Sequence, residues 1–497
     1  MGTVVQSVTK EVFLTAVGCR TAGWFLRHAV GEAPPTPGES LRMEEGNEVH
    51  RRARSLFPQG VSAMAPGATA AAMKTARLMA DNSLPAIYEA TFHVKGYVAR
   101  ADILTRLNGG WHLIEVKSDT SDKDELLDDL AYTAMVAQRG GLKVAKASLL
   151  LVSKDFRLGM ADEKLFTEVD RTDDLKARVK EFLPFWEDVD TQTKQPKRPA
   201  ADLTLDCRKC PYFGDICLGK GIEDHIFDLP RLSQRKFDDL EASGVVTIPK
   251  IPKRFDLTEP QERVRQSVVR GKPVVETSLA PDLATVVWPA YYLDFETVMT
   301  AMPLYPKLAP YTQLPTQYSL HVCSAPGQVT AHHEYLADPS RDCRRELAEK
   351  LIADVGKKGS VISYSSFENT VIGKLADHFP DLAKPLHAIQ DRIVDLEAIL
   401  RNGFYHPDFH GRTSIKVTLP VLVQNMSYAG LEIGDGDTAV AMFARMAKGQ
   451  VGKAEVERIR KALLVYCGQD TMAMVKLHEK LKRLTGVQGN GPTGVGQ

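Results

Sequence analysis

The apolar positions of the first part of the chain, residues 1–183, change between helical and strand spacing. Where they recur every three or four residues they predict amphipathic helices, and where they alternate with polar residues they predict strands. Both spacings occur within this one segment, which indicates a mixed α/β domain. The expected elements are helices over 13–28, 44–56 and 126–138, and strands over 87–107, 111–116 and 147–152.

The rest of the chain predicts a linker, a small helical module and a second α/β domain. This second domain begins near Trp288 with the apolar strand AYYLDF and ends with a helix over 456–484. Residues 188–202, which include TQTKQPKRPA, have linker composition. The module at 222–255 ends in GVVTIPKIPKR and is similar to helix–hairpin–helix elements that bind phosphate backbones. We therefore expect an α/β multidomain protein divided into 1–220, a helical connector over 221–285, a domain over 286–484 and a disordered Gly-rich tail over 485–497.

Length and composition fit this division. A chain of 497 residues exceeds what one hydrophobic core supports, so two or three domains are expected. No apolar run reaches the roughly 20 residues that span a bilayer, and the N-terminus lacks a secretory apolar segment. We expect a cytoplasmic protein without a membrane partner. Basic and acidic residues number 63 each, which speaks against a polyanion binder held by overall charge but leaves room for acidic metal ligands beside a locally basic groove.

A first group of candidate residues lies in YVARADILTRLNGGWHLIEVKSDT. Asp102 ends one strand, a Gly-Gly turn follows, and the next strand carries Glu115 and Lys117. Residues two apart in a strand share a face, so Glu115 and Lys117 point together while Val116 faces the core. Two carboxylates suit a hard cation such as Mg²⁺ or Mn²⁺, and a lysine offsets charge on a phosphoryl group or orients water. An ordinary same-face ion pair on an exposed hairpin is the alternative.

Asp plus Glu-x-Lys resembles the signature of PD-(D/E)XK nucleases. Gly46 and His50 match the Gly-x-x-x-His element of the RecB-like members, which implies His50, Asp102 and Glu115 as metal ligands and Lys117 as a catalytic residue. The following helix of that family carries Gln-x-x-x-Tyr. Tyr132 fits the tyrosine and is implied as catalytic, but aspartate occupies the glutamine position. A single histidine on a helix is also common as a structural or solvated residue.

Four of the seven cysteines form a second candidate site. Cys207, Cys210 and Cys217 have the spacing C-x₂-C-x₆-C, which suits a thiolate-bound metal whose fourth ligand comes from elsewhere. The order of elements from Cys19 to these three resembles RecB-like exonucleases of CRISPR adaptation and the nuclease domain of AddB, which implies a 4Fe–4S cluster joining both ends of the domain. A zinc site with His225 or Cys19 as the fourth ligand is the alternative, and Cys19 would otherwise be a core residue.

The C-terminal half contains a third group of candidates. Asp294 and Glu296 end an apolar strand and share a face, and Tyr466 and Asp470 are four apart on a helix. Their order resembles that of DEDD exonucleases of the DnaQ-like, RNase H-fold class, which have a mixed-sheet α/β domain. The resemblance implies Asp294, Glu296, Glu368 and Asp470 as ligands of two divalent cations and Tyr466 as the residue that positions water. Glu368 departs from the usual aspartate of its motif, and Asp395 is either a supporting residue or a helix N-cap.

The segments LPTQYSLHV and YHPDFHGRTSIKVTLPVL resemble a bacterial family of unknown function that is coupled to RecB-like nucleases. Within them, Arg412 and Lys416 are candidate nucleic-acid contacts, or else residues of a solvated loop.

Together the resemblances imply a metal-dependent deoxyribonuclease with two active sites, acting as an exonuclease on DNA ends or single strands in repair, recombination or defence. RNA is not excluded as a partner. The alternatives are a nuclease with one active site and a decayed C-terminal domain, or a non-catalytic nucleic-acid-binding scaffold.

Overall fold

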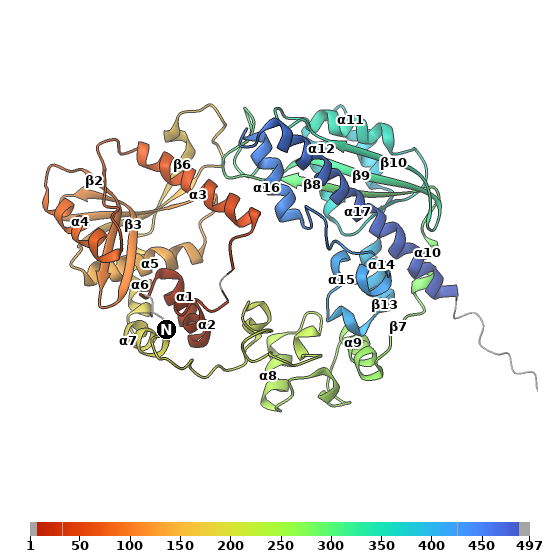
Figure 1. The fold of residues 1–497 in the computed structure, drawn as a ribbon, viewed down its shortest axis with the longest axis horizontal. Coiled ribbons are helices and arrows are strands. Elements are labelled where there is room, and N and C mark those ends of the chain that lie inside the picture. The colour runs from red at the N-terminus through yellow and green to blue at the C-terminus, as the bar shows by residue number, and fades with distance from the viewer. Residues whose placement is uncertain (1–6, 32, 425, 487–497) are drawn as a thin grey trace, which may run out of the picture. The chain divides into compact units, whose positions relative to one another are not determined.

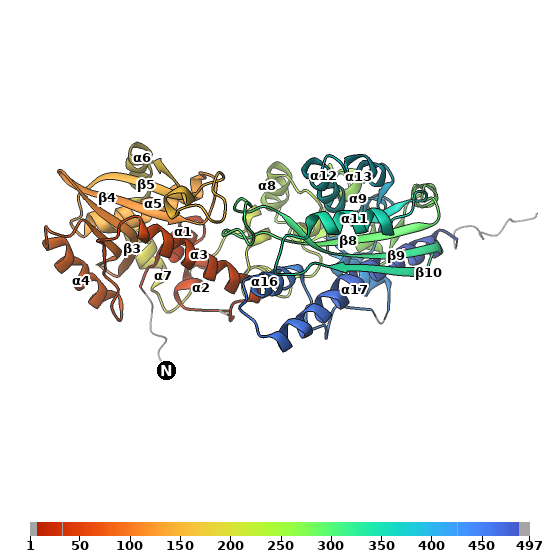
Figure 2. The same ribbon diagram turned by 90° about the horizontal axis from the view of Figure 1, so that it is seen from above.

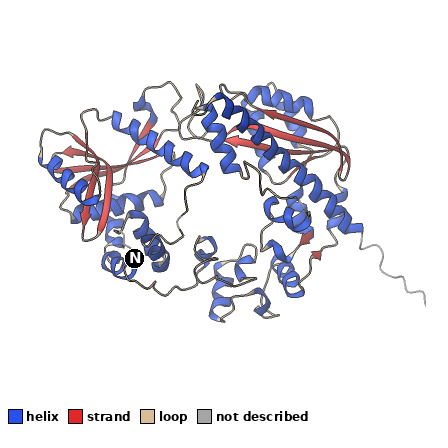
Figure 3. Cartoon of the chain, in the orientation of Figure 1, coloured by secondary structure: helices blue, strands red, loops and turns tan. Residues whose placement is uncertain are grey.

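The computed structural model describes residues 7–31, 33–424 and 426–486. Most of the predicted tail, residues 487–497, lies outside them. The chain forms two compact units, and each contains one large mixed sheet with helices against it (Figure 3). Unit 1 comprises 1–202 and 299–312, and unit 2 comprises 203–298 and 313–497. A mixed α/β multidomain fold was predicted and is confirmed. The described helices include none that is both long and apolar enough to cross a bilayer.

Unit 1 is built on a six-stranded sheet in the order β1-β2-β3-β4-β5-β6. The pairs β1–β2 and β4–β5 are parallel and the other neighbours are antiparallel. The strands are β1 (Val61–Ser62), β2 (Ala86–Val94), β3 (Tyr97–Leu107), β4 (Gly110–Lys117), β5 (Val144–Val152) and β6 (Phe166–Asp170). The helices are α1 (Lys10–Gly18), α2 (Arg20–Arg27), α3 (Pro37–Ser55), α4 (Ala68–Ala80), α5 (Asp124–Arg139), α6 (Thr172–Phe182) and α7 (Phe185–Thr193).

Alternation along β4 divides the apolar residues of unit 1 between two cores. Leu113 belongs to the core shared with α1 and α5, whereas Ile114 and Val116 belong to the core shared with α3. Helices therefore cover both faces of the sheet, which explains why β4 is buried along most of its length.

Two predicted elements of unit 1 differ in the structure. The helix expected over 13–28 is two helices, because Cys19 is extended (φ −148°, ψ 112°) and caps α2 by accepting the Ala22 N–H at 3.4 Å. The linker expected over 188–202 begins later, because α7 continues to Thr193 and buries Val189 in the core.

Unit 2 is built on a five-stranded sheet in the order β10-β9-β8-β11-β12. Strands β8, β11 and β12 are parallel, and β9 is antiparallel to both β8 and β10. The strands are β8 (Ala290–Val298), β9 (Leu314–Ala325), β10 (Gln328–Leu336), β11 (Val361–Ser363) and β12 (Ile393–Asp395), with a separate pair β7 (Val274–Val275) and β13 (Phe404–Tyr405).

Helices of unit 2 include the 34-residue helix α17 (Lys453–Gly486), which packs along β8, β9 and β10 (Figures 1 and 2). The others are α8 (Gln234–Ala242), α9 (Glu259–Arg270), α10 (Leu279–Ala284), α11 (Arg344–Asp354), α12 (Phe367–His378), α13 (Ala383–Gln390), α14 (Leu396–Gly403), α15 (Ile415–Leu422) and α16 (Gly436–Ala447).

The predicted connector is part of the core of unit 2. Phe237 of α8 and Val264 of α9 are buried in the same cluster as Tyr292 of β8 and Leu477 of α17. The preceding segment, which carries three of the candidate cysteines, also packs against this core through Phe213. The units thus group residues 203–285 with the C-terminal half.

Candidate metal centres

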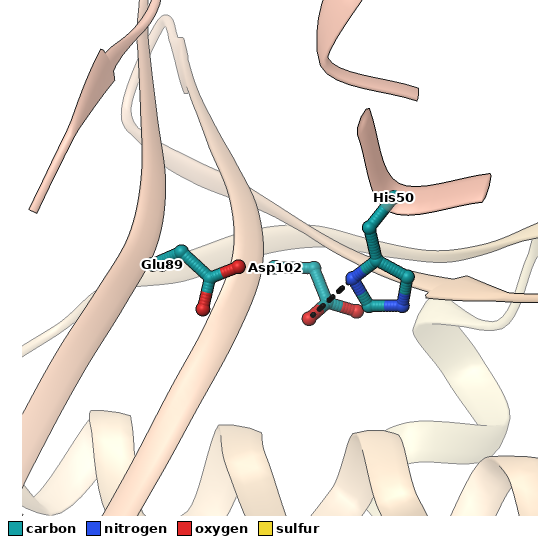
Figure 4. A group of neighbouring side chains, drawn as sticks. All are labelled: His50, Glu89 and Asp102. Carbon is teal, nitrogen blue, oxygen red and sulfur yellow. Dashed lines mark ion pairs between the residues drawn. The ribbon is translucent and has the colours of Figure 1, made fainter. Parts of the chain in front are cut away.

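The first candidate centre lies in unit 1 and combines a histidine with two carboxylates. His50 comes from α3, Glu89 from β2 and Asp102 from β3, and one ligand atom of each lies within 4.8 Å of the others. His50 Nδ1 is 3.6 Å from Asp102 Oδ1. Figure 4 shows the three side chains converging, with Asp102 between the other two. An imidazole nitrogen and carboxylate oxygens are suitable ligands for a divalent transition metal.

Strand pairing explains how the two carboxylates meet. The β3–β4 ladder runs as far as Ile103 and Ile114, and beyond it Asp102 Oδ2 accepts the Val116 N–H at 2.8 Å. Glu89 lies opposite Asp102, between paired residues of β2 and β3. Its φ is +53°, a left-handed conformation that is uncommon for glutamate. Such local strain is concentrated at functional sites.

The predicted pairing of Glu115 and Lys117 on β4 is present. Glu115 Oε1 lies 3.1 Å from Lys117 Nζ and 2.7 Å from the Nζ of Lys10, which comes from α1. Lys117 also bonds Asp129 of α5, while Val116 faces the opposite core as predicted. Two lysines thus converge on one buried carboxylate.

Charges in this centre oppose one another. Burial would raise the pKa of Glu115, but Lys117 and Lys10 offset burial and hold the pKa at about 2. Burial and then the charge of Glu115 raise the pKa of Asp102 well above its ordinary value. Burial lowers the pKa of His50, which favours the neutral, metal-binding imidazole. The second carboxylate oxygen of Glu115 is buried without a hydrogen-bond partner among the described residues.

The structure brings His50 and Asp102 together as predicted, but the third residue within ligand distance is Glu89 rather than Glu115. Sequence analysis missed Glu89, although a glutamate inside the apolar strand AIYEATF was a usable signal. It also missed Lys10 of α1 and Asp129 of α5. These residues lie on other elements than Glu115 and Lys117, and no local motif marks them.

Tyr132, implied as catalytic, occupies a different environment. Its side chain is fully buried, and its hydroxyl lies 2.7 Å from the Val8 carbonyl and 3.1 Å from the Val98 carbonyl. These contacts hold the N-terminal segment against β3. Asp128, at the family's glutamine position, lies 3.2 Å from Arg178 instead. In the described contacts Tyr132 therefore packs in the core of unit 1, and Asp128 forms an ion pair.

The second candidate centre lies in unit 2. Asp294 and Glu296 of β8 and Asp470 of α17 each place a carboxylate oxygen within 4.8 Å of the others. The strand alternation points the first two residues to one face, and α17 packs on that face of β8. Tyr466 is one helical turn before Asp470, as predicted from the sequence. Three of the four predicted carboxylates therefore meet.

Further side chains surround these carboxylates. The Tyr428 hydroxyl donates to Asp470, and Cys467 Sγ lies 3.5 Å from Asp294 Oδ2. Lys416 Nζ donates to the Tyr466 hydroxyl at 3.2 Å. Sequence analysis missed Tyr428, which lies in a loop between α15 and α16 where no periodic pattern marks it.

Glu368, at the start of α12, is 3% exposed, and its Oε2 has no hydrogen-bond partner among the described residues. It is not in the group of three, but Asp395 and Asp470 act on its charge. Burial is the main cause that raises the pKa of Glu368 to about 7. The backbone hydrogen bond acts to lower this pKa, and the charges of Asp395 and Asp470 act to raise it. Asp395 accepts the Ala398 N–H at 3.0 Å and is the N-cap of α14, as its alternative interpretation predicted.

Burial and mutual repulsion keep protons on this centre. Burial first, and then the charge of Asp470, raise the pKa of Asp294 well above its ordinary value and that of Glu296 to about 8. Burial raises the pKa of Asp470 to about 6 although Tyr428 and Lys416 act to lower it. Crowded carboxylates of this kind need protons or a cation, so the donor set fits Mg²⁺ or Mn²⁺.

The candidate cysteines are divided between the units. Cys19 belongs to unit 1, whereas Cys207, Cys210 and Cys217 belong to unit 2. All four are partly buried. Among the described residues, three groups bring metal-ligand atoms within 4.8 Å, and none of these groups includes a cysteine. His225, the alternative zinc ligand, accepts the Phe227 N–H at 3.1 Å through Nδ1.

The third of these groups joins Asp224, Asp228 and His410 in unit 2, and His410 Nδ1 is 3.2 Å from Asp228 Oδ2. Arg412, a candidate nucleic-acid contact, is exposed, and its charge acts on Asp228. Lys416, the other candidate, instead borders the second centre.

Comparison with known families gives one match. Residues 291–414 match the family model described as domain of unknown function (DUF2779). The matched range includes Asp294, Glu296 and Glu368 and ends before Asp470. It agrees with the resemblance to a family of unknown function drawn from the sequence. Comparison with curated proteins gave no match.

Proposed function

We propose that this chain is a metal-dependent nuclease that hydrolyses DNA at two active sites, one in each unit. The observation that carries the proposal is the presence of two separate groups of converging carboxylates with buried, proton-retaining members. Such groups are costly without a cation, and phosphodiester hydrolysis is a common use of paired cations held by carboxylates.

The arrangement of unit 1 supports a PD-(D/E)XK nuclease core. Asp102 and Glu115 lie where the β3–β4 ladder ends, and Lys117 follows on the same face as Glu115. Strand β4 pairs in parallel with β5. Helix α5, which lies between these two strands in the sequence, packs against the sheet. His50 on α3 adds the imidazole expected from the RecB-like resemblance.

The arrangement of unit 2 supports an RNase H-like exonuclease domain. Its strand order has three parallel strands beside an antiparallel β9, and the carboxylates lie on the first strand and on a helix packed against it. The Tyr466 and Asp470 spacing places both on the side of α17 that borders these carboxylates.

The chemistry divides between the cation and the side chains. A divalent cation bound at either centre would lower the pKa of water and neutralise the phosphate. In unit 1, Lys117 stays charged because Glu115 and Asp129 outweigh its burial, so its role is to stabilise phosphoryl charge. In unit 2, burial raises the pKa of Tyr466, so its neutral hydroxyl would donate a hydrogen bond to water or substrate.

The 4Fe–4S cluster remains a proposal that rests on the sequence resemblance, which combines the spacing of the cysteines with the order of the motifs between them. Cys19 belongs to one unit and the other three cysteines to the other, so no step is assigned to the cluster. Anaerobic purification followed by iron, sulfide and zinc analysis separates the cluster from a zinc site, and a protein without any of these removes both.

The test of the proposed function uses end-labelled single- and double-stranded DNA with Mg²⁺ or Mn²⁺. Wild type is compared with Asp102→Asn, Asp294→Asn and the double variant. We expect nucleotide release by wild type, partial loss in each single variant and complete loss in the double variant.

Exposed aspartates in each unit provide matched controls. Asp173→Asn and Asp381→Asn remove the same charge at side chains that are 95% and 57% exposed. A wild-type protein that retains DNA but releases no nucleotide with either cation would overturn the proposal in favour of a scaffold. If one single variant alone abolishes release, the chain has one active site.

A further inference from the structure

Unit 2 contains a cavity of about 440 Å³ whose charged lining side chains are all arginines. Four segments surround it: the residues that follow Asp228, the start of α9, the end of α14 and the loop that follows β13. Its volume falls in the range of small-ligand pockets. The described residues that line it include Arg231, Arg263 and Arg401.

The three arginines differ in how firmly they are held. Arg263 is anchored, because its Nε bonds Glu276 at 2.7 Å and its Nη1 donates to the Arg401 carbonyl at 2.9 Å. Arg401 lies 3.8 Å from Glu397 and is 47% exposed. Arg231 is exposed and forms no ion pair with any described residue. At least one guanidinium therefore has its charge available for a ligand.

The remaining lining groups fit a ligand with both a charged and an apolar part. Asn402 and Thr258 offer polar contacts, whereas Pro230, Pro260 and Val264 provide an apolar wall. Guanidinium groups bind phosphate oxygens through two parallel hydrogen bonds, and this geometry favours arginine over lysine at phosphate sites. A nucleotide combines a phosphate with a flat aromatic base whose faces pack against apolar side chains, and a cavity of this size accommodates one.

We propose that this arginine cavity, defined by Arg231, Arg263 and Arg401, binds the phosphate of a nucleotide. The nucleotide is either free or the phosphorylated end of a strand, since both present the same group. None of the residues of the two carboxylate centres lines the cavity, and its lining contains no carboxylate among the described residues. The cavity therefore binds the nucleotide without hydrolysing it, and the inference does not rest on the proposed nuclease activity.

The experiment measures equilibrium binding to the full-length protein in EDTA, so that hydrolysis does not interfere. The probes are dAMP, inorganic phosphate, and one fluorescent oligodeoxynucleotide prepared with a 5′-phosphate or a 5′-hydroxyl. The test variant is Arg231→Ala with Arg401→Ala, which leaves the anchored Arg263 and its ion pair in place. The control variant is Arg235→Ala with Arg270→Ala, which removes two arginines of unit 2 outside the cavity.

We expect the test variant to bind the preferred probe at least about tenfold more weakly, with the control unchanged. The slope of log affinity against log salt for an oligonucleotide should become shallower by about one per arginine that contacts phosphate. Preference for dAMP identifies a free nucleotide, and preference for the 5′-phosphorylated strand over the 5′-hydroxyl strand identifies a strand end. The proposal is overturned if the test and control variants bind every probe equally well. It is also overturned if wild type binds none of the probes.

Discussion

Lys117 shows how a buried ammonium group keeps its charge. Burial acts to lower its pKa, but Glu115 and Asp129 raise the pKa above the ordinary value of 10.5. Lys117 is consequently protonated at neutral pH. A protonated lysine cannot accept a proton from water, so its contribution in the proposed reaction is electrostatic.

Replacement of Lys117 by alanine should therefore reduce hydrolysis at the first centre by about 100-fold, the usual effect of losing one charge-stabilising group. The assay uses the Asp294→Asn background, in which only the first centre is read. Lys123→Ala is the matched control, because Lys123 is 53% exposed and pairs with Asp119 at the surface. Full activity of Lys117→Ala across the neutral pH range would exclude the assigned role.

Tyr428 offers a second prediction at the level of one hydroxyl. Burial raises the pKa of Asp470 to about 6, even though the hydrogen bond from Tyr428 acts to lower it. Tyr428→Phe should raise the pKa of Asp470 further. The acid limb of the pH–activity profile of the second centre should then move to higher pH, with little change above about pH 8. The profile is recorded in the Asp102→Asn background.

A general defect would lower activity equally at all pH values, and this result would contradict the assignment. Tyr311→Phe is a suitable control, since the Tyr311 hydroxyl bonds the Ser118 carbonyl in unit 1.

At the level of elements, the sequence predicts residues that share one strand or one helix. The alternation on β4 predicts the pairing of Glu115 with Lys117, and the helical spacing on α17 predicts that Tyr466 and Asp470 share a side. Each of these patterns depends on a local period. The paired carboxylates of β8 follow from the same rule.

Residues contributed by neighbouring elements escape such prediction. Tyr428 reaches Asp470 from a loop, and Lys10 reaches Glu115 from a helix that is 105 positions away. The cap at Cys19 divides a helix that apolar spacing alone predicts as continuous. Contacts between elements depend on how they pack, and a single sequence contains no periodic signal for that packing.

Glu89 permits a test at the level of the sheet. Its position opposite Asp102 and its left-handed φ place a carboxylate beside His50, where the sequence implied Glu115 as the ligand. Glu89→Gln should weaken Mn²⁺ binding at the first centre by about tenfold, because one charged ligand is lost. Binding is measured by calorimetry in the Asp294→Asn background.

Glu168→Gln is the matched control for this test. Glu168 lies on β6 of the same sheet, is 42% exposed and pairs with Lys146 at the surface. Unchanged Mn²⁺ affinity in Glu89→Gln, together with a loss in Glu115→Gln, would return the ligand role to Glu115 and limit Glu89 to its ion pair with Arg54.

For the whole molecule, carboxylates with raised pKa values link stability to pH. Glu296 has an ordinary pKa of 4.5 and a folded pKa of about 8, so the folded state binds more protons than the unfolded state between these values. Stability from this group is present at low pH and is lost as pH rises through the folded pKa. Buried histidines such as His321 have lowered pKa values and act in the opposite direction below their ordinary value of 6.5.

The window from about pH 6.5 to 8.5 therefore isolates the carboxylates. In EDTA we expect the melting temperature of wild type to fall as pH rises through this window, because Asp294 and Glu296 lose protons in a buried site. Asp294→Asn with Glu296→Gln should flatten this dependence and melt at least about 2 °C higher than wild type at pH 8.5. Mn²⁺ replaces the protons, so it should stabilise wild type more at pH 8.5 than at pH 6.5 and should have a smaller effect on the double variant. A wild-type melting temperature that rises across the window, with equal Mn²⁺ shifts at both ends, would show that these carboxylates do not retain protons and that the second centre does not bind the cation.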